Sequence, residues 1–293
     1  MNSKPIASSE LIITPKGTVY HLDLHPDHLA DTIITVGDPD RVASVSKYFD
    51  AMEHQAQHRE FITHTGRIGN KRISVVSTGI GPDNIDIVLN ELDALANIDF
   101  DTRTIRDEKK TLSIIRLGTS GALQADIEVD SMVASSFAIG LDNLMHYYLY
   151  ESNPEETYIL GEFQQHTGLT DKPVWPYIAE GAIRLRNHFS EGFHSGITVT
   201  CPGFYGPQGR VLRGQIAFPN LIDALGTFGS RGQRITNFEM ETSAIYGLGK
   251  MLGHQCLSIS TIVANRIHQT FSSDGTAAVD NMIQKSLAII EKI

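Results

Sequence analysis

Cysteine is nearly absent from this chain of 293 residues. The two that occur, Cys201 and Cys256, cannot build a disulfide framework, which is typical of a protein from a reducing compartment. We interpret both thiols as inert core residues rather than nucleophiles.

Long apolar runs are missing as well. No segment approaches the roughly 20 apolar residues of a membrane helix, and residues 1–17 lack the apolar stretch of a signal peptide. There is also no internal repeat and no low-complexity tract. The sequence therefore predicts a cytoplasmic protein without a membrane partner.

Positive charge is in short supply. Lys and Arg number 24 against 34 Asp and Glu, which gives a formal net charge of -10. Broad nucleic-acid binding needs a basic face that displaces counterions from phosphates, so this composition argues against it. An anionic substrate would need a local cluster of arginines.

What is abundant is an alternation of short β-branched runs with helical patterns. The runs, which predict buried strands, are residues 32–36, 73–77, 113–117, 131–134, 197–200 and 257–263. Apolar residues recur at helical spacing in residues 82–95, 177–189, 241–252 and 279–293, and Asp83 or Asn84 is the expected cap of the first. We predict an α/β fold: one domain at residues 19–293, a three-layer α/β/α sandwich with a central mixed β-sheet, after an N-terminal extension at residues 1–18.

Two stretches interrupt this alternation. Residues 99–110 are strongly charged, which predicts a solvated loop. Residues 150–176 contain several prolines and glycines, and the pattern leaves open a mobile flap or an excursion at the sheet edge.

Four segments combine a predicted strand end, glycines and polar groups, the combination found where open α/β sheets bind ligands. In VGDPDR (36–41), Gly37 ends a strand, Pro39 suits the first turn of a helix, and Arg41 follows. An anion site and a plain strand-helix turn both fit this segment. In STGIGP (77–82), two glycines allow close approach of a ligand, but taken alone the segment favours a structural turn.

The other two segments carry buried charge. RLGTSG (116–121) places Arg116 inside an apolar run, which is costly unless an anion pairs with it, so a ligand role is favoured over a structural ion pair. NFEMETSA (237–244) opens a predicted helix, on which Glu239 and Glu241 would point to different faces. One of them could bind a hydroxylated substrate while the other caps the helix or pairs locally. Taken alone, the segment favours two solvated glutamates in a first helical turn.

Together with FYGPQGR (204–210), these segments resemble the nucleoside phosphorylase family of the uridine phosphorylase type, over about residues 19–269. FYGPQGR is similar to the FYxxQxR segment with which uridine phosphorylases hold uracil. The resemblance implies phosphorolysis of uridine to uracil and ribose 1-phosphate, in a homodimer with shared active sites or in a hexamer. Uridine and inorganic phosphate are the implied substrates, and no cofactor is implied.

The resemblance also assigns residues. It places phosphate at Gly37, Arg41, Arg116 and Thr119, together with Arg59 lent by a neighbouring subunit. It places the ribose at Met240 and Glu241, together with His21 lent by the neighbour. It places the base at Ser120, Gly121, Phe204, Gln208 and Arg210. Arg116, Arg210 and Glu241 are the implied catalytic residues.

Some positions depart from the family pattern. Where purine-specific members have an aspartate after the late strand, this chain reads VANR with Asn265, which favours uracil over a purine. Some bacterial members hold potassium with a serine and a glutamate. Glu60 is present but Asn84 is not serine, so the resemblance does not bring a metal site with it. A purine or broad-specificity nucleoside phosphorylase, a hydrolase relative and a non-catalytic nucleoside-binding relative are the alternatives.

Overall fold

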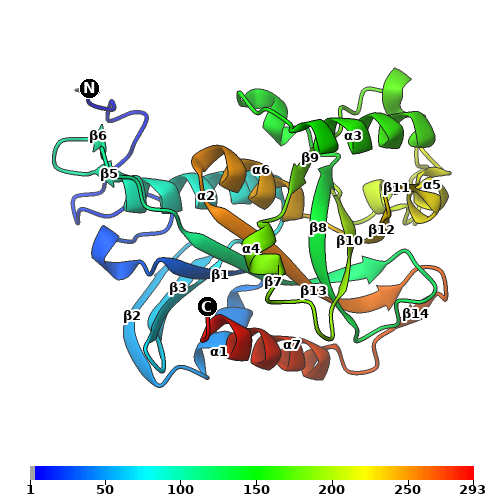
Figure 1. The fold of residues 1–293 in the computed structure, drawn as a ribbon. Coiled ribbons are helices and arrows are strands. Elements are labelled where there is room, and N and C mark those ends of the chain that lie inside the picture. The colour runs from blue at the N-terminus through cyan, green and yellow to red at the C-terminus, as the bar shows by residue number, and fades with distance from the viewer. Residues whose placement is uncertain (1–3) are drawn as a thin grey trace.

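A path of ten hydrogen-bonded strands runs through the centre of the protein, which a computed structural model describes for residues 4–293 (Figure 1). Their order is β11 (Gly229–Ser230), β12 (Gln233–Glu239), β10 (His194–Thr200), β8 (Met132–Gly140), β13 (Gln255–Asn265), β7 (Ser113–Ala122), β1 (Thr32–Val36), β4 (Lys71–Ser77), β3 (Phe61–Ile68) and β2 (Ala51–His58). At the sides, β9 (Tyr177–Glu180) pairs with β8 and β14 (Thr270–Phe271) with β13. β1 is parallel to both of its neighbours, whereas β13 and β8 are antiparallel, so the sheet is mixed, as predicted.

One end of this sheet closes on itself. β12 pairs antiparallel with β7, where Asn237 lies opposite Ala122 and Phe238 opposite Gly121. Strands β7, β13, β8, β10 and β12 therefore form a ring, which the sequence did not predict. The closure brings the end of β12 against the second half of β7, and both strands carry predicted site residues.

Helices cover the two faces of the open part of the sheet (Figure 1). α2 (Pro82–Asn97) and α6 (Thr242–Leu252) lie on one face, and α1 (Pro39–Ser46) and α7 (Gly275–Ile290) on the other. α3 (Pro154–Thr167) and α5 (Leu221–Thr227) pack near the ring, and α4 (Ile183–Arg186) is a single turn. The alternation of buried side chains in β1 matches these layers, because Ile33 joins the α2–α6 core and Ile34 the α1–α7 core.

The predicted strands are all found, and most of them are longer than predicted, β7 and β8 by the largest margin. β7 continues to Ala122 and β8 to Gly140, because β13 and β10 supply hydrogen-bonding partners along their whole length. RLGTSG is therefore strand rather than a turn after one. Cys201 and Cys256 are buried, as expected, and burial raises the pKa of the Cys256 thiol to about 12.

Three features of the predicted helices differ in the structure. The expected helix at 177–189 is wrong: Tyr177–Glu180 is strand β9, held by antiparallel pairing with β8, and only α4 follows. The cap of α2 is Gly81, not Asp83 or Asn84, because Pro82 already occupies the first helical position. α7 begins at Gly275, earlier than predicted, and the Asp274 side chain caps it.

The two irregular stretches differ in outcome. Residues 99–110 are mostly exposed, as predicted, and include a small hairpin of β5 (Ile98–Asp99) and β6 (Thr104–Ile105). Residues 150–176 contain α3, a helix that the sequence did not predict. Asn153 and Glu156 form a reciprocal capping box at its start, and Gly168 ends it. This capping pattern can be recognised in the sequence and would have predicted the start of α3.

The chain before residue 19 is tied to the rest of the protein. Residues 1–3 of the predicted extension lie outside the described residues. Further along, Leu11 is buried, Ile13 forms a bridge with Val19, and the Arg103 Nε donates to the Ile6 carbonyl. Within residues 4–293, no helix is both long and apolar enough to cross a membrane. A cytoplasmic location stays a prediction.

A buried hydroxyl links α6 to the sheet and gives a stability prediction. The Tyr246 hydroxyl donates to the Ser135 carbonyl at 2.8 Å and accepts from the Ser258 amide at 2.9 Å. Tyr246→Phe leaves both backbone groups unsatisfied, so we expect a loss of about 1–3 kcal/mol in the free energy of unfolding, measured with urea. The exposed Tyr158, as Tyr158→Phe, is the control and should change stability by less than about 0.5 kcal/mol. Equal effects of the two variants would contradict this.

Candidate functional site

A cavity of about 660 Å³ opens where the segments after β1, β4, β10 and β12 meet β7 and β13. Its size is in the usual range for small-molecule sites. Most of the predicted site residues line it: Gly37, Arg41, Arg116, Thr119, Ser120, Gly121, Phe204, Gln208, Arg210, Met240 and Glu241. Residues far apart in the sequence are thus brought to one place.

Arg116 is buried in the wall of this cavity, with 5% of its surface exposed. Its Nη2 lies 2.5 Å from a carboxylate oxygen of Glu241 and 3.2 Å from one of Glu239. Burial opposes the charged form, but the two carboxylates outweigh it and raise the pKa of Arg116. The arginine therefore makes a buried ion pair and also lines the cavity, so the structural pairing that the sequence disfavoured is present.

The sequence predicted that the two glutamates would point to different faces, but in the structure both contact Arg116. That expectation assumed a regular helix, whereas Glu239 ends β12 and Glu241 precedes the first residue of α6. Both are buried, so the alternative of two solvated glutamates is also wrong. Glu239 accepts hydrogen bonds from the backbone amides of Glu241 and Thr242, and so caps α6.

Glu241 is fixed from a second direction by the STGIGP turn. The Gly81 amide donates to its Oε1 at 2.9 Å, and Gly81 adopts a φ of 103°, which glycine tolerates best. Burial raises the pKa of Glu241, while Arg116 acts in the opposite sense. The Gly81 amide thus holds a protein carboxylate, which favours a structural role for Gly81. The other glycine of the turn, Gly79, lines the cavity.

Arg41 brings a second guanidinium to the same cavity. It lies in the first turn of α1, which has Pro39 at its first position, as predicted, and is capped by the Asp38 side chain. Burial and the nearby charge of Arg116 lower the pKa of Arg41. Two partly desolvated like charges beside one cavity are stabilised by an anion that both can contact.

The FYGPQGR segment forms another part of the wall. The Arg210 guanidinium lies over the Phe204 ring, 3.8 Å from its centroid, and its Nη1 donates to the Gln208 Oε1 at 2.6 Å. Gln208 is buried, and Arg266 donates to its backbone carbonyl at 2.9 Å. Burial, followed by repulsion from Arg266, lowers the pKa of Arg210. An amide and a guanidinium are thus held rigidly side by side.

The VANR segment supports this wall from behind. The Asn265 amide donates to the Gln124 and Ile127 carbonyls and accepts from the Ile267 and His268 amides. This side chain is therefore committed to its own turn and is not available to a base.

Several lining residues had not been assigned to the site from the sequence, although some lie in the VGDPDR, STGIGP and NFEMETSA segments. They are Asp38, Pro39, Glu60, Gly79, Ile80, Asn84, Phe238, Glu239, Val263, Ala264 and Phe271. A register shift between Ile262 and Ala264 marks a bulge of β13 at the cavity. Apolar side chains such as Phe238 carry no chemical signal, so only the three-dimensional arrangement identifies them.

His21 and Arg59 are not among the lining residues; they lie in a separate cluster at the edge of the protein. Arg59 sits in the two-residue turn between β2 and β3 with a φ of 55°, and its Nη2 donates to the Tyr20 hydroxyl at 3.3 Å. His21 Nδ1 lies 2.6 Å from a Glu91 oxygen. A positive φ at arginine is strained, and such strain is common at functional positions.

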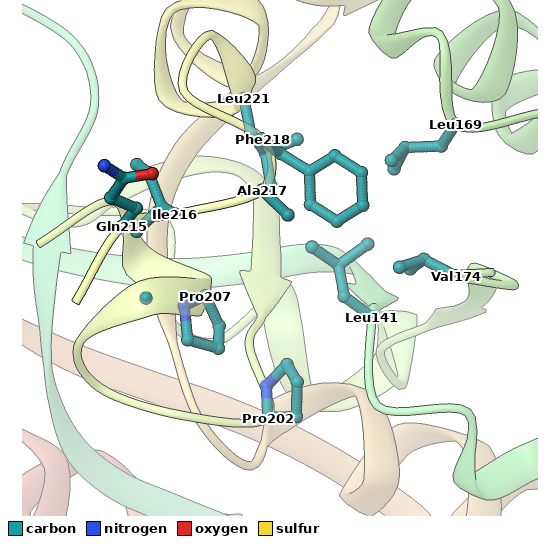
Figure 2. Close-up of a pocket in the computed structure, with 11 residues that line it drawn as sticks. Leu141, Leu169, Val174, Pro202, Pro207, Gln215, Ile216, Ala217, Phe218 and Leu221 are labelled. Carbon is teal, nitrogen blue, oxygen red and sulfur yellow. The ribbon is translucent and has the colours of Figure 1, made fainter. Parts of the chain in front are cut away.

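A second cavity, of about 290 Å³, lies beside the turn that carries Gln208 (Figure 2). Figure 2 shows Leu141, Leu169 and Phe218 pointing toward one another in it. Gln215 is the one lining residue with a polar side chain. The convergent charges of the larger cavity make that cavity the candidate active site.

Comparison with known proteins agrees with the geometry. Residues 31–292 match the family model described as the phosphorylase superfamily. A uridine phosphorylase of Thermococcus kodakarensis is 32% identical over 92% of this chain and 85% of its own length. A solved Trypanosoma brucei nucleoside phosphorylase, described as showing uridine phosphorylase activity, superposes with a TM-score of 0.87 at 32% identity, covering 96% of this chain and 98% of its own. A DeoD-type purine nucleoside phosphorylase of Streptococcus suis is 26% identical, over 83% of this chain and 84% of its own.

Gly118 tests how the buried arginine is held. A Cβ at this position would lie 1.8 Å from Arg116 Nη1, so Gly118→Ala must displace the guanidinium from its two glutamates. We expect a loss of about 1–3 kcal/mol in unfolding free energy. Gly161→Ala, at a helical glycine with open space around it, is the control and should be neutral or slightly stabilising. Thermal unfolding of both variants measures the change. A Gly118→Ala variant with unchanged stability would show that Gly118 does not confine the arginine.

Proposed function

The chain belongs to the phosphorylase superfamily and is a pentosyltransferase, and on that basis we propose that it is a uridine phosphorylase, which converts uridine and inorganic phosphate reversibly to uracil and ribose 1-phosphate. One observation carries the proposal. Two electrostatically coupled arginines, a buried glutamate and an amide–guanidinium pair line a single cavity. These groups match an anion, a sugar and a uracil in turn.

The anion end supports phosphate as the nucleophile. Arg41 and Arg116 supply charge-assisted hydrogen bonds to a dianion, and Thr119 adds a hydroxyl donor. Breaking the N-glycosidic bond builds positive charge on the sugar, as in other glycosyl transfers. A phosphate held below C1' acts as nucleophile and as counterion to this charge.

Glu241 is suited to the ribose. Arg116 and the Gly81 amide hold its carboxylate in place, and both Glu241 and Met240 line the cavity. A carboxylate accepts from the 2'- and 3'-hydroxyls, and its negative charge stabilises the developing cation. Because its partners are already in place, it needs little reorganisation during the reaction.

Gln208 and Arg210 explain a preference for uracil. Gln208 Oε1 accepts from Arg210 and has a second lone pair for the N3 hydrogen, while the Gln208 amino group donates to a uracil carbonyl. Arg210 stabilises the negative charge on the departing base. Cytosine has no N3 hydrogen, so it would leave the Gln208 Oε1 without that hydrogen bond. The commitment of Asn265 to its turn disfavours a purine substrate.

We further propose that two subunits share each active site. Arg59 and His21 lie away from the cavity of their own chain but carry groups suited to phosphate and ribose. A homodimer brings such an edge to the neighbouring cavity, and a hexamer of dimers preserves the same contact.

Removing the base-reading guanidinium tests the pocket. Arg210→Ala should lower kcat/KM on uridine about 100-fold, because a preorganised donor to the leaving group is lost. Arg213→Ala, an exposed arginine three residues further along, is the matched control and should stay near wild type. A wild-type rate in Arg210→Ala would refute the base-pocket assignment.

Substrate preference tests the function itself. We expect uracil release from uridine that depends on phosphate, with inosine and adenosine turned over at least about 100-fold less efficiently. Uracil release without phosphate would indicate a hydrolase, and tight uridine binding without turnover a binding protein. Comparable rates on inosine would indicate a broad-specificity phosphorylase.

Site sharing is tested by mixing two inactive variants. In a heterodimer of Arg41→Ala and Arg59→Ala subunits, one site carries both substitutions and the other carries none. Random reassociation of equal amounts should therefore restore about a quarter of the wild-type activity per site. If each subunit used its own Arg59, the mixture would stay as inactive as its components.

A further inference from the structure

The His21 ring is anchored by one carboxylate that also binds the backbone around it. His21 Nδ1 lies 2.6 Å from Glu91 Oε1, and the His21 amide donates to the same carboxylate at 2.9 and 3.1 Å. The Leu22 amide donates to Oε2 at 2.9 Å. We propose that Glu91 is a positioning residue for the shared active site, which sets His21 to bind the ribose 5'-hydroxyl in the neighbouring subunit. This inference rests on the proposed function.

The number of donors fixes the role of each ring nitrogen. An ionised carboxylate only accepts, so the Nδ1 facing Glu91 must carry a hydrogen. The other nitrogen, Nε2, is then left for a ligand, and 26% of the His21 side chain is exposed. Nε2 accepts a hydroxyl hydrogen when the ring is neutral and donates to a hydroxyl oxygen when the ring is protonated. A hydroxyl such as the ribose 5'-hydroxyl satisfies either state.

Surrounding groups keep the ring in this orientation. Tyr20 and Phe61 meet the imidazole edge-to-face, with ring centroids 4.9 and 6.4 Å away. His58 Nδ1 donates to the His21 carbonyl at 3.1 Å, which fixes the backbone. A carboxylate that holds the ring while its faces are packed is the arrangement by which a second group orients a functional histidine.

Glu91 also links this edge to the chain's own cavity through α2. The helix begins at Pro82, directly after Gly81, whose amide holds the cavity residue Glu241. Nine residues later, Glu91 holds His21. One rigid helix therefore connects the amide that holds Glu241 at the chain's own site to the carboxylate that holds His21 at the edge that we assign to the neighbour's site.

The test compares uridine with 5'-deoxyuridine, which lacks only the hydroxyl in question. In the wild type we expect kcat/KM for uridine to exceed that for 5'-deoxyuridine at least about tenfold, the effect of a hydrogen bond in a desolvated site. Glu91→Gln should bring this ratio to within about threefold of unity, because an amide has one acceptor oxygen where the carboxylate has two and cannot accept from Nδ1 and from the His21 and Leu22 amides together. The substitution should lower kcat/KM for uridine much more than kcat/KM for 5'-deoxyuridine.

The matched control lies two residues away on α2. Asp93 contacts His254 Nε2 at 3.2 Å, so Asp93→Asn removes a similar carboxylate–histidine contact outside the site and should leave the ratio unchanged. In a His21→Ala background, Glu91→Gln should have no further effect on the ratio. Thermal unfolding of each variant checks that it is folded.

The outcomes separate the two proposals. Equal losses on both substrates in Glu91→Gln, or an unchanged ratio, would overturn the positioning role while leaving uridine phosphorolysis intact. A further change of the ratio in the His21→Ala background would also overturn it, because Glu91 would then act without His21. Wild-type protein that releases no uracil with phosphate would refute the proposed function, and this inference with it.

Discussion

The site depends on one buried interaction, the contact of the Arg116 guanidinium with the carboxylates of Glu239 and Glu241. A charge taken out of water is costly unless its partners compensate, and here they come from the end of β12 and the start of α6. The backbone contributes as well, since Gly81 donates to one glutamate and Gly118 leaves room for the arginine. Strand β7, strand β12 and helices α2 and α6 are thus fixed to one another at the cavity.

Ring closure makes this interaction possible. If the sheet were open, β12 and β7 would lie on separate parts of it, and Glu239 could not reach Arg116. The antiparallel pairing of Phe238 with Gly121 brings the two strands together, and the bulge of β13 shapes the wall between them. The charged groups of the cavity are therefore held in fixed positions, and groups that need not move stabilise a bound charge at a lower reorganisation cost.

The sequence predicted the fold class and six of the strands because these strands contain short, buried β-branched runs. It did not predict β3 or β12, in which polar and apolar residues are mixed, or β2, a polar and exposed strand of sequence AMEHQAQH. It also missed β9, because pairing with β8 overrides the helical spacing of that segment. Charged and glycine-rich segments pointed to the cavity, but no local pattern shows that two glutamates two residues apart meet one arginine. That convergence depends on a strand end and a helix start, which only the tertiary structure reveals.

The most direct test of the account is a crystal structure of the protein with uracil and ribose 1-phosphate. The account predicts phosphate oxygens within about 3 Å of the Arg41 and Arg116 guanidinium groups, and the uracil edge at the Gln208 amide. It also predicts a guanidinium and an imidazole from a neighbouring subunit at the phosphate and at the 5'-oxygen. Ligands bound outside this cavity, or a cavity completed by one chain alone, would contradict it.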